Sequence, residues 1–186
     1  MRRILFGLFA AILVLAFSQT ARAEETMYAR CNLKVLKGNK ISWMNWQSAP
    51  TFIPAGTKLK VTVSGDSATF TDKDGTSYSV DLGAAGDKFL AKFVTKSQVN
   101  IEKYSSSVTA DIRKAVIKAG MTAEQAYIAM GPPAYIDGKN KTDSSTYEDI
   151  VKAKMWVYKR STFGKNIGIE FDNNGKVTRT EGIWGK

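Results

Sequence analysis

The sequence predicts an α+β protein, with a small antiparallel β-barrel over residues 24–103 and a two-helix, three-stranded antiparallel sheet over residues 104–186. Short alternating runs joined by Gly, Asp and Pro turns fill the first part, which is typical of a small barrel. Two stretches with helical spacing and then three strand-like runs fill the second part, which is typical of an α+β unit. Residues 1–23 precede both domains.

The first 23 residues have the pattern of a secretory signal peptide. Arg2 and Arg3 precede an apolar run from Ile4 to Phe17, and Ala21-Arg22-Ala23 provides a cleavage site. The run is shorter than the roughly 20 residues that span a bilayer. We therefore expect cleavage near Ala23 and a periplasmic or secreted protein, with a retained N-terminal anchor as the alternative.

Cys31 is the only cysteine, so the chain forms no intramolecular disulfide and depends on its core. Polar residues separate it from the apolar run, so we expect no lipidation. A small buried residue in a strand is the expected role of this thiol, with a reactive thiol as the alternative.

Composition narrows the class of function. The chain has 27 basic and 17 acidic residues, and removal of the signal peptide with its three arginines leaves 24 and 17. Such a surface attracts an anionic membrane, a cell-wall polymer or an acidic protein. Nucleic acid is not expected, because the chain is exported and its aromatic residues do not alternate with Arg. The absence of histidine excludes histidine-based triads and zinc sites, so we expect a protein that is not an enzyme and needs no cofactor.

The first domain is expected to contain short strands joined by tight turns. A strand is predicted over 27–36, and Gly38-Asn39 should turn the chain into a return strand over 40–46. Strands over 57–63, 68–71 and 76–82 follow, with hairpin turns at 65–66 and 73–75. Residues 87–94 fit either a short helix or a strand that closes the sheet.

Two helices open the second domain. Residues 108–119 have helical spacing, with Thr109 as the expected cap and Gly120 as the end. Thr122 and Gln125 then form a capping box, and Gly131-Pro132-Pro133 ends a helix of about two turns. Residues 137–149 are polar and predict an exposed loop. Strands are expected over 153–159, 166–172 and 176–184, with a hairpin turn at 173–175.

The order of these features resembles the SmpA/OmlA family. Gly120-Met121-Thr122, Gln125-Ala126 and Met130-Gly131 followed by Pro133 match its helix signature, and Trp156-Val157-Tyr158 matches its W-x-Y strand. This family includes the small outer-membrane lipoprotein of the β-barrel assembly machinery. The resemblance implies an ααβββ domain, shared as a fold with β-lactamase-inhibitor proteins, and non-catalytic binding of envelope proteins. Residues 53–61 also resemble a strand entry of bacterial SH3-like domains, which implies an SH3-like barrel over 24–103.

Five aromatic residues are the candidate partner-binding residues. Trp43, Trp46 and Phe52 cluster near prolines, as in an aromatic groove for an extended peptide, while filling of the barrel core is the alternative. Trp156 and Tyr158 are added from the W-x-Y strand. No metal or catalytic site is expected.

Two groups of acidic residues are possible sites of a metal or of acid/base chemistry. Asp72, Asp74 and Asp81 do not have EF-hand spacing and are interpreted as turn residues. Glu148 and Asp149 are adjacent, and on a strand they would point to opposite faces, so a catalytic pair is not expected.

These observations favour a non-catalytic adaptor of the bacterial cell envelope that recognises a periplasmic or outer-membrane protein or peptide. The alternative is a secreted inhibitor that plugs an enzyme cleft, with the 137–149 loop as its contact segment. A cell-wall-associated enzyme is a further, less favoured alternative.

Overall fold

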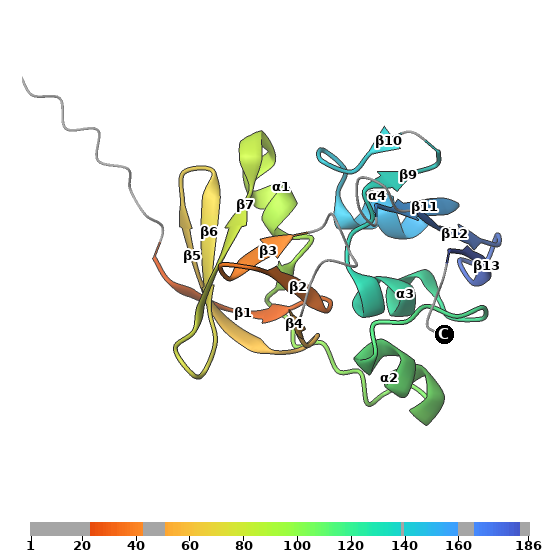
Figure 1. Ribbon diagram of the computed structural model, residues 1–186, viewed down its shortest axis with the longest axis horizontal. Coiled ribbons are helices and arrows are strands. Elements are labelled where there is room, and N and C mark those ends of the chain that lie inside the picture. The colour runs from red at the N-terminus through yellow and green to blue at the C-terminus, as the bar shows by residue number, and fades with distance from the viewer. Residues whose placement is uncertain (1–22, 43–50, 139, 160–165, 183–186) are drawn as a thin grey trace, which may run out of the picture.

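Two β-sheets organise residues 23–42, 51–138, 140–159 and 166–182, which are the residues that the computed structural model describes. The large sheet is curled and has the strand order β4-β2-β3-β7-β6-β5-β1-β8 (Figure 1). Its strands are β1 (Glu25–Ala29), β2 (Leu33–Leu36), β3 (Lys40–Ser42), β4 (Thr51–Ile53), β5 (Lys58–Ser64), β6 (Ser67–Thr71), β7 (Ser77–Asp81) and β8 (Val94–Thr95). The mixed α+β class is therefore confirmed.

Local turns produce the predicted hairpins of this sheet. Gly38 and Asn39, with φ of 77° and 54°, reverse the chain between β2 and β3. Gly75, with φ of 80°, does the same between β6 and β7. The prediction of a wholly antiparallel barrel is wrong at one place, because β3 meets β7 in parallel at Lys40 and Ser79. No turn joins these two strands, so packing rather than a hairpin sets their direction.

The predicted strand over 27–36 is instead two strands that lie far apart in the sheet order. The chain bends over residues 30–32, and Cys31 and Asn32 are buried there. Cys31 is thus buried as predicted, but in a bend rather than a strand. Main-chain N–H of Asn32 donates to Ile128 O at 2.9 Å, so the bend faces the second part of the chain.

Residues 87–94 contain both predicted alternatives, first a short helix and then a strand at the sheet edge. A 3₁₀ turn, η2 (Gly83–Ala85), leads into α1 (Gly86–Leu90), and β8 then pairs with β1 at the sheet edge. Phe89, Leu90 and Phe93 are buried as expected.

The two predicted helices differ in how well their bounds were predicted. The first, α2 (Ser106–Arg113), is capped by Ser105 rather than Thr109, and it stops early where Ala115 takes a φ of 54°. The second, α3 (Ala123–Met130), has both hydrogen bonds of the Thr122 and Gln125 capping box. Gly131 ends it with a φ of 73°, as predicted.

The second sheet has the order β10-β9-β11-β12-β13. Its strands are β9 (Tyr135–Ile136), β10 (Asn140–Lys141), β11 (Met155–Tyr158), β12 (Ile167–Phe171) and β13 (Val177–Glu181). The last three form the predicted antiparallel meander. The exposed loop predicted over 137–149 is correct in part: most of its described residues are exposed, but the segment also contains β10, the buried Thr142 and the start of α4 (Tyr147–Lys152).

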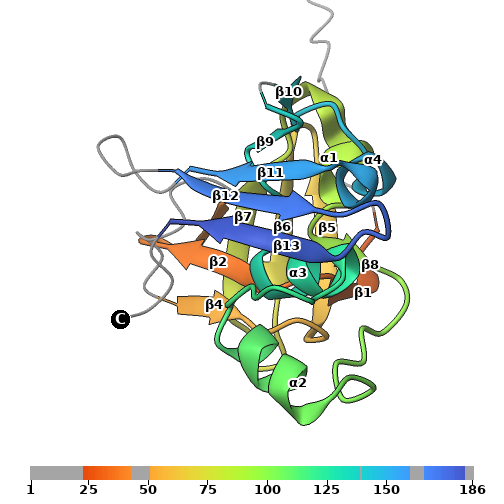
Figure 2. The ribbon, with the colours of Figure 1, turned by 90° about the vertical axis from the view of Figure 1, so that its right-hand side faces the viewer.

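One hydrophobic core runs through both parts of the chain. In Figure 1, α3 lies between the large sheet and the second sheet, and Figure 2 shows β11, β12 and β13 in front of the large sheet. Leu59 and Phe70 of the large sheet and Tyr127 and Trp156 of the second part belong to the same buried cluster. The two predicted domains therefore share their core at the junction.

Candidate functional site

The five aromatic candidates lie in different environments. Trp43 and Trp46 fall outside the described residues. Phe52, on the edge strand β4, is half-buried. Trp156 and Tyr158 are fully buried on β11, where the Trp156 indole N–H donates to Ile150 O at 2.7 Å. The expectation that these last two contact a partner is wrong, because strand alternation turns them inward against α3 and α4.

Phe52 and Pro54 separate two hollows on the surface. The larger hollow, of about 690 Å³, lies between these residues, the segment 98–102 and Arg113 of α2. The smaller hollow, of about 480 Å³, lies between them, the start of β5 and the turn after β6 with Tyr78 of β7. We call the two together the Phe52 furrow. Phe52 lines both hollows, while the aromatic groove predicted with Trp43 and Trp46 stays a prediction, since these two residues lie outside the described part of the chain.

Asp72 and Asp74 beside this furrow, and Asp81 at the end of β7, act as turn residues, as predicted. Asp72 Oδ1 accepts hydrogen bonds from the N–H groups of Asp74 and Thr76 at 2.9 and 3.0 Å, and its Oδ2 accepts from the Tyr78 hydroxyl at 3.0 Å. Asp81 accepts from Gly83 N–H at 2.9 Å. Within the described part of the chain, no three Cys, Asp or Glu side chains gather as a metal site.

Glu148 and Asp149 lie on a helix, so the strand assumed for them is wrong. They form the first turn of α4, and Asp149 completes a capping box with Thr146 through hydrogen bonds of 2.8 and 3.1 Å. The carboxylate of Asp149 is thereby committed to holding the helix start.

Lys92 is a buried titratable residue that sequence patterns did not single out. Its ammonium group donates to the main-chain carbonyls of Thr142 and Asp143 and lies 4.6 Å from the centre of the Phe89 ring. Burial lowers the pKa of Lys92 to about 8, and the nearby Asp143 opposes this shift. These hydrogen bonds connect the chain just after α1 to the segment 137–149, for which an exposed loop was predicted.

The Cys31 thiol is equally enclosed. Burial raises its pKa to about 12, against the weaker opposite effect of Lys34 and Arg30. A neutral, fully buried thiol is a poor nucleophile. This confirms the packing interpretation of Cys31.

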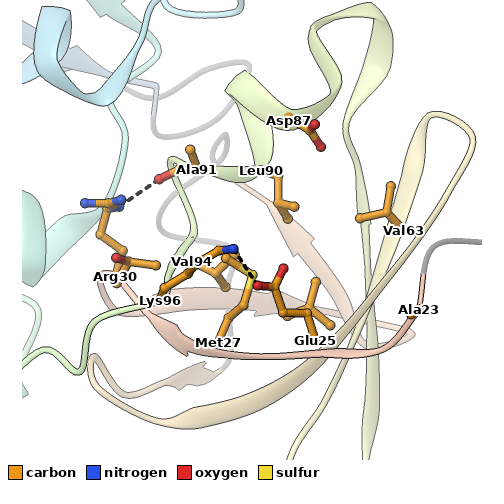
Figure 3. Close-up of a pocket in the computed structure, with 12 residues that line it drawn as sticks. Ala23, Glu25, Met27, Arg30, Val63, Asp87, Leu90, Ala91, Val94 and Lys96 are labelled. Atoms are coloured by element: carbon orange, nitrogen blue, oxygen red, sulfur yellow. Dashed lines mark hydrogen bonds and ion pairs between the residues drawn. The ribbon is translucent and has the colours of Figure 1, made fainter.

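A third concavity opens at the mouth of the curled sheet (Figure 3). It has a volume of about 440 Å³ and lies between β1, β5, β8 and α1. Its apolar wall comes from Met27, Val61, Val63, Leu90 and Val94. The ion pair of Lys96 with Glu25, 2.7 Å long, crosses its rim. Residues from four elements build this mouth pocket, so no local motif could have revealed it.

Comparisons with known proteins assign neither a family nor a function to this protein. No protein-family model, no curated protein and no solved structure matches the chain. None of the helices in the described part of the chain is long and apolar enough to cross a membrane.

Proposed function

We propose that this protein is a non-catalytic binding protein of the bacterial cell envelope, which recognises an extended segment of a periplasmic or outer-membrane protein in the Phe52 furrow. The proposal treats residues 24–103 as an SH3-like unit and residues 104–186 as an SmpA/OmlA-like ααβββ unit. The signal-peptide pattern of residues 1–23 supports placement in the periplasm or outside the cell.

The observation that supports this proposal is the position of Phe52 and Pro54 between two hollows. Aromatic-lined grooves bind extended peptides, and the entropic cost is low when the peptide is already extended before it binds. Partly buried Val99 and Ile101 add apolar surface on one side, and the half-buried Tyr78 adds an aromatic ring on the other.

The charges of the furrow are largely matched within the protein. Arg113 pairs with Glu102 in the larger hollow, and Lys73 pairs with Asp74 at the edge of the smaller one. Contacts with apolar and aromatic side chains should therefore dominate affinity, while charged groups at the rim set orientation.

The test is crosslinking in the native envelope with a photoreactive residue at Lys58, which is exposed at the wall of the smaller hollow, followed by identification of the recovered protein by mass. Phe52→Ala should reduce the crosslinked product at least tenfold. Tyr135→Ala is the matched control, since Tyr135 is also a half-buried aromatic residue on a strand but lies in the second sheet. A product unchanged by Phe52→Ala, or lost equally in the control, would contradict the proposal.

A further inference from the structure

Strand β1 has an edge that is only partly paired. On one side it pairs with β5 from Glu25 to Tyr28. On the other side it pairs with β8 at Tyr28 and Ala29 alone. Beyond Thr95 the chain bends away at Lys96 and Ser97. The first half of β1 therefore extends past its neighbour.

The hydrogen-bond alternation shows which groups lie on this edge. Ala29 N–H donates to Thr57 O and its carbonyl accepts from Gly56 N–H, both on the β5 side. Arg30 N–H donates to Phe93 O on the β8 side. Because successive residues of a strand present their N–H and C=O groups to opposite edges, Thr26 presents its own groups to the β8 side. Among the described residues, no strand pairs with β1 at Thr26 on that side.

The mouth pocket lies directly beside this edge. Glu25 and Met27 alternate with Thr26 along β1 and line the pocket (Figure 3). In a strand added at the edge, the side chains that share the orientation of Glu25 and Met27 would enter the apolar space beside Val63 and Leu90. Main-chain groups and a side-chain pocket are thus presented together, as in binding by β-strand addition.

We propose that the free edge of β1 at Thr26 and the mouth pocket form a β-strand-addition site for an extended segment of another exported protein, with an apolar side chain in the pocket. Within the described residues the N–H and C=O of Thr26 have no strand partner on this side, and such groups are complementary to another extended main chain rather than to a compact ligand.

This site is separate in its residues from the Phe52 furrow, so the two proposals fail independently. The probe is a panel of fluorescein-labelled peptides that alternate Thr with Val, Leu or Phe. The protein is expressed from the full sequence and purified from the envelope fraction, and binding is followed by fluorescence anisotropy. Phe52→Ala should leave peptide binding within twofold of wild type.

Two protein variants and one peptide variant test the mode of binding. Thr26→Pro removes the edge N–H without touching a bond to β5, and it should weaken binding at least tenfold. Thr26→Val keeps that N–H and should bind within twofold of wild type. Val63→Glu, which places a charge in the pocket, and a peptide with one amide replaced by an ester should each weaken binding about tenfold.

Each result decides the proposal. Loss of binding with Thr26→Pro, Val63→Glu and the ester peptide supports it, and if Thr26→Pro does not fold, the other two decide. Absence of binding by the whole panel, or binding unaffected by Val63→Glu and the ester, overturns it. A dimer that Thr26→Pro abolishes, seen by sedimentation without peptide binding, would also overturn it, because a second copy would then occupy the edge.

Discussion

The side-chain amide of Asn32 donates a 2.9 Å hydrogen bond to the main-chain carbonyl of Ala129, which joins a bend of the large sheet to the last turn of α3. The same amide donates to Ile112 O in the last turn of α2 at 2.7 Å, and Asn32 N–H donates to Ile128 O at 2.9 Å. The last carbonyls of a helix have no partner within it. One residue from the first half therefore caps two helices of the second half, while its Oδ1 accepts from Ala55 N–H at 3.0 Å.

Asn32→Ala should lower the free energy of unfolding by about 3 kcal/mol, because it removes the hydrogen-bond partner of the Ala129 carbonyl and of the Ala55 N–H, whereas the Ile112 carbonyl keeps the N–H of Ala115. Urea denaturation measures the change, and the two halves should still unfold in one transition. Asn100→Ala is the matched control: its exposed amide caps only Glu102 N–H, and the cost should stay below about 1 kcal/mol. Equal losses in both variants would contradict the junction role of Asn32.

Gly131→Ala should destabilise the protein more than Gly120→Ala, although both glycines have a positive φ. An added Cβ at Gly131 would lie 3.0 Å from the Cys31 sulfur, whereas one at Gly120 would meet nothing within 4 Å. We expect losses of about 2 and about 1 kcal/mol. In the double variant with Cys31→Ala, the cost of Gly131→Ala should fall toward that of Gly120→Ala. If thermal melts show that the stability losses of Gly131→Ala and Cys31→Ala simply add in the double variant, the Cys31 sulfur does not obstruct the added Cβ.

Lys92 should make stability rise with pH in an alkaline window. Burial lowers its pKa to about 8 from 10.5, so the unfolded chain holds more protons than the folded protein between these values. The free energy of unfolding contributed by Lys92 therefore increases from about pH 8 to pH 10.5 and is lost as pH falls. The neutral amine can still donate to the carbonyls of Thr142 and Asp143.

The measurement is the difference in melting temperature between wild type and Lys92→Met from pH 7 to pH 10. The melting temperature of the wild type should rise relative to that of the variant as the pH increases. Burial also raises the pKa of Tyr127 and Cys31, which lowers stability at high pH in both proteins and cancels in the difference. A difference that is flat with pH would show that Lys92 keeps an ordinary pKa.

Thr122→Ala should cost about 1 kcal/mol, because the Thr122 hydroxyl accepts from Gln125 N–H at 3.2 Å at the start of α3. Thr122→Ser retains this hydroxyl and should remain within about 0.5 kcal/mol of wild type. Guanidinium denaturation of the two variants provides the comparison. Similar losses of stability in the two variants would mean that the methyl group of Thr122, and not its capping hydroxyl, stabilises the helix start.

Structures fixed by adjacent residues were predictable. The α3 helix has its capping box, its small packing face and its glycine end within residues 122–131, and the hairpin turns at Gly38-Asn39 and Gly75 likewise depend on backbone preferences of a few residues. The errors occurred where distant residues take part. The helical pattern over 108–119 ends early at Ala115, and the polar segment 137–149 folds because Lys92 and the buried Thr142 hold it.

The candidate site divides in the same way. The sequence alone showed the signal-peptide pattern, the missing histidine and the single thiol, and it singled out Phe52 near Pro54 as a candidate. Tertiary structure decided that Trp156 and Tyr158 are core residues and that β8 ends short of Thr26. The reason is that turns and caps depend on contacts a few residues apart, whereas burial, strand order and free edges depend on which distant segments the core brings together.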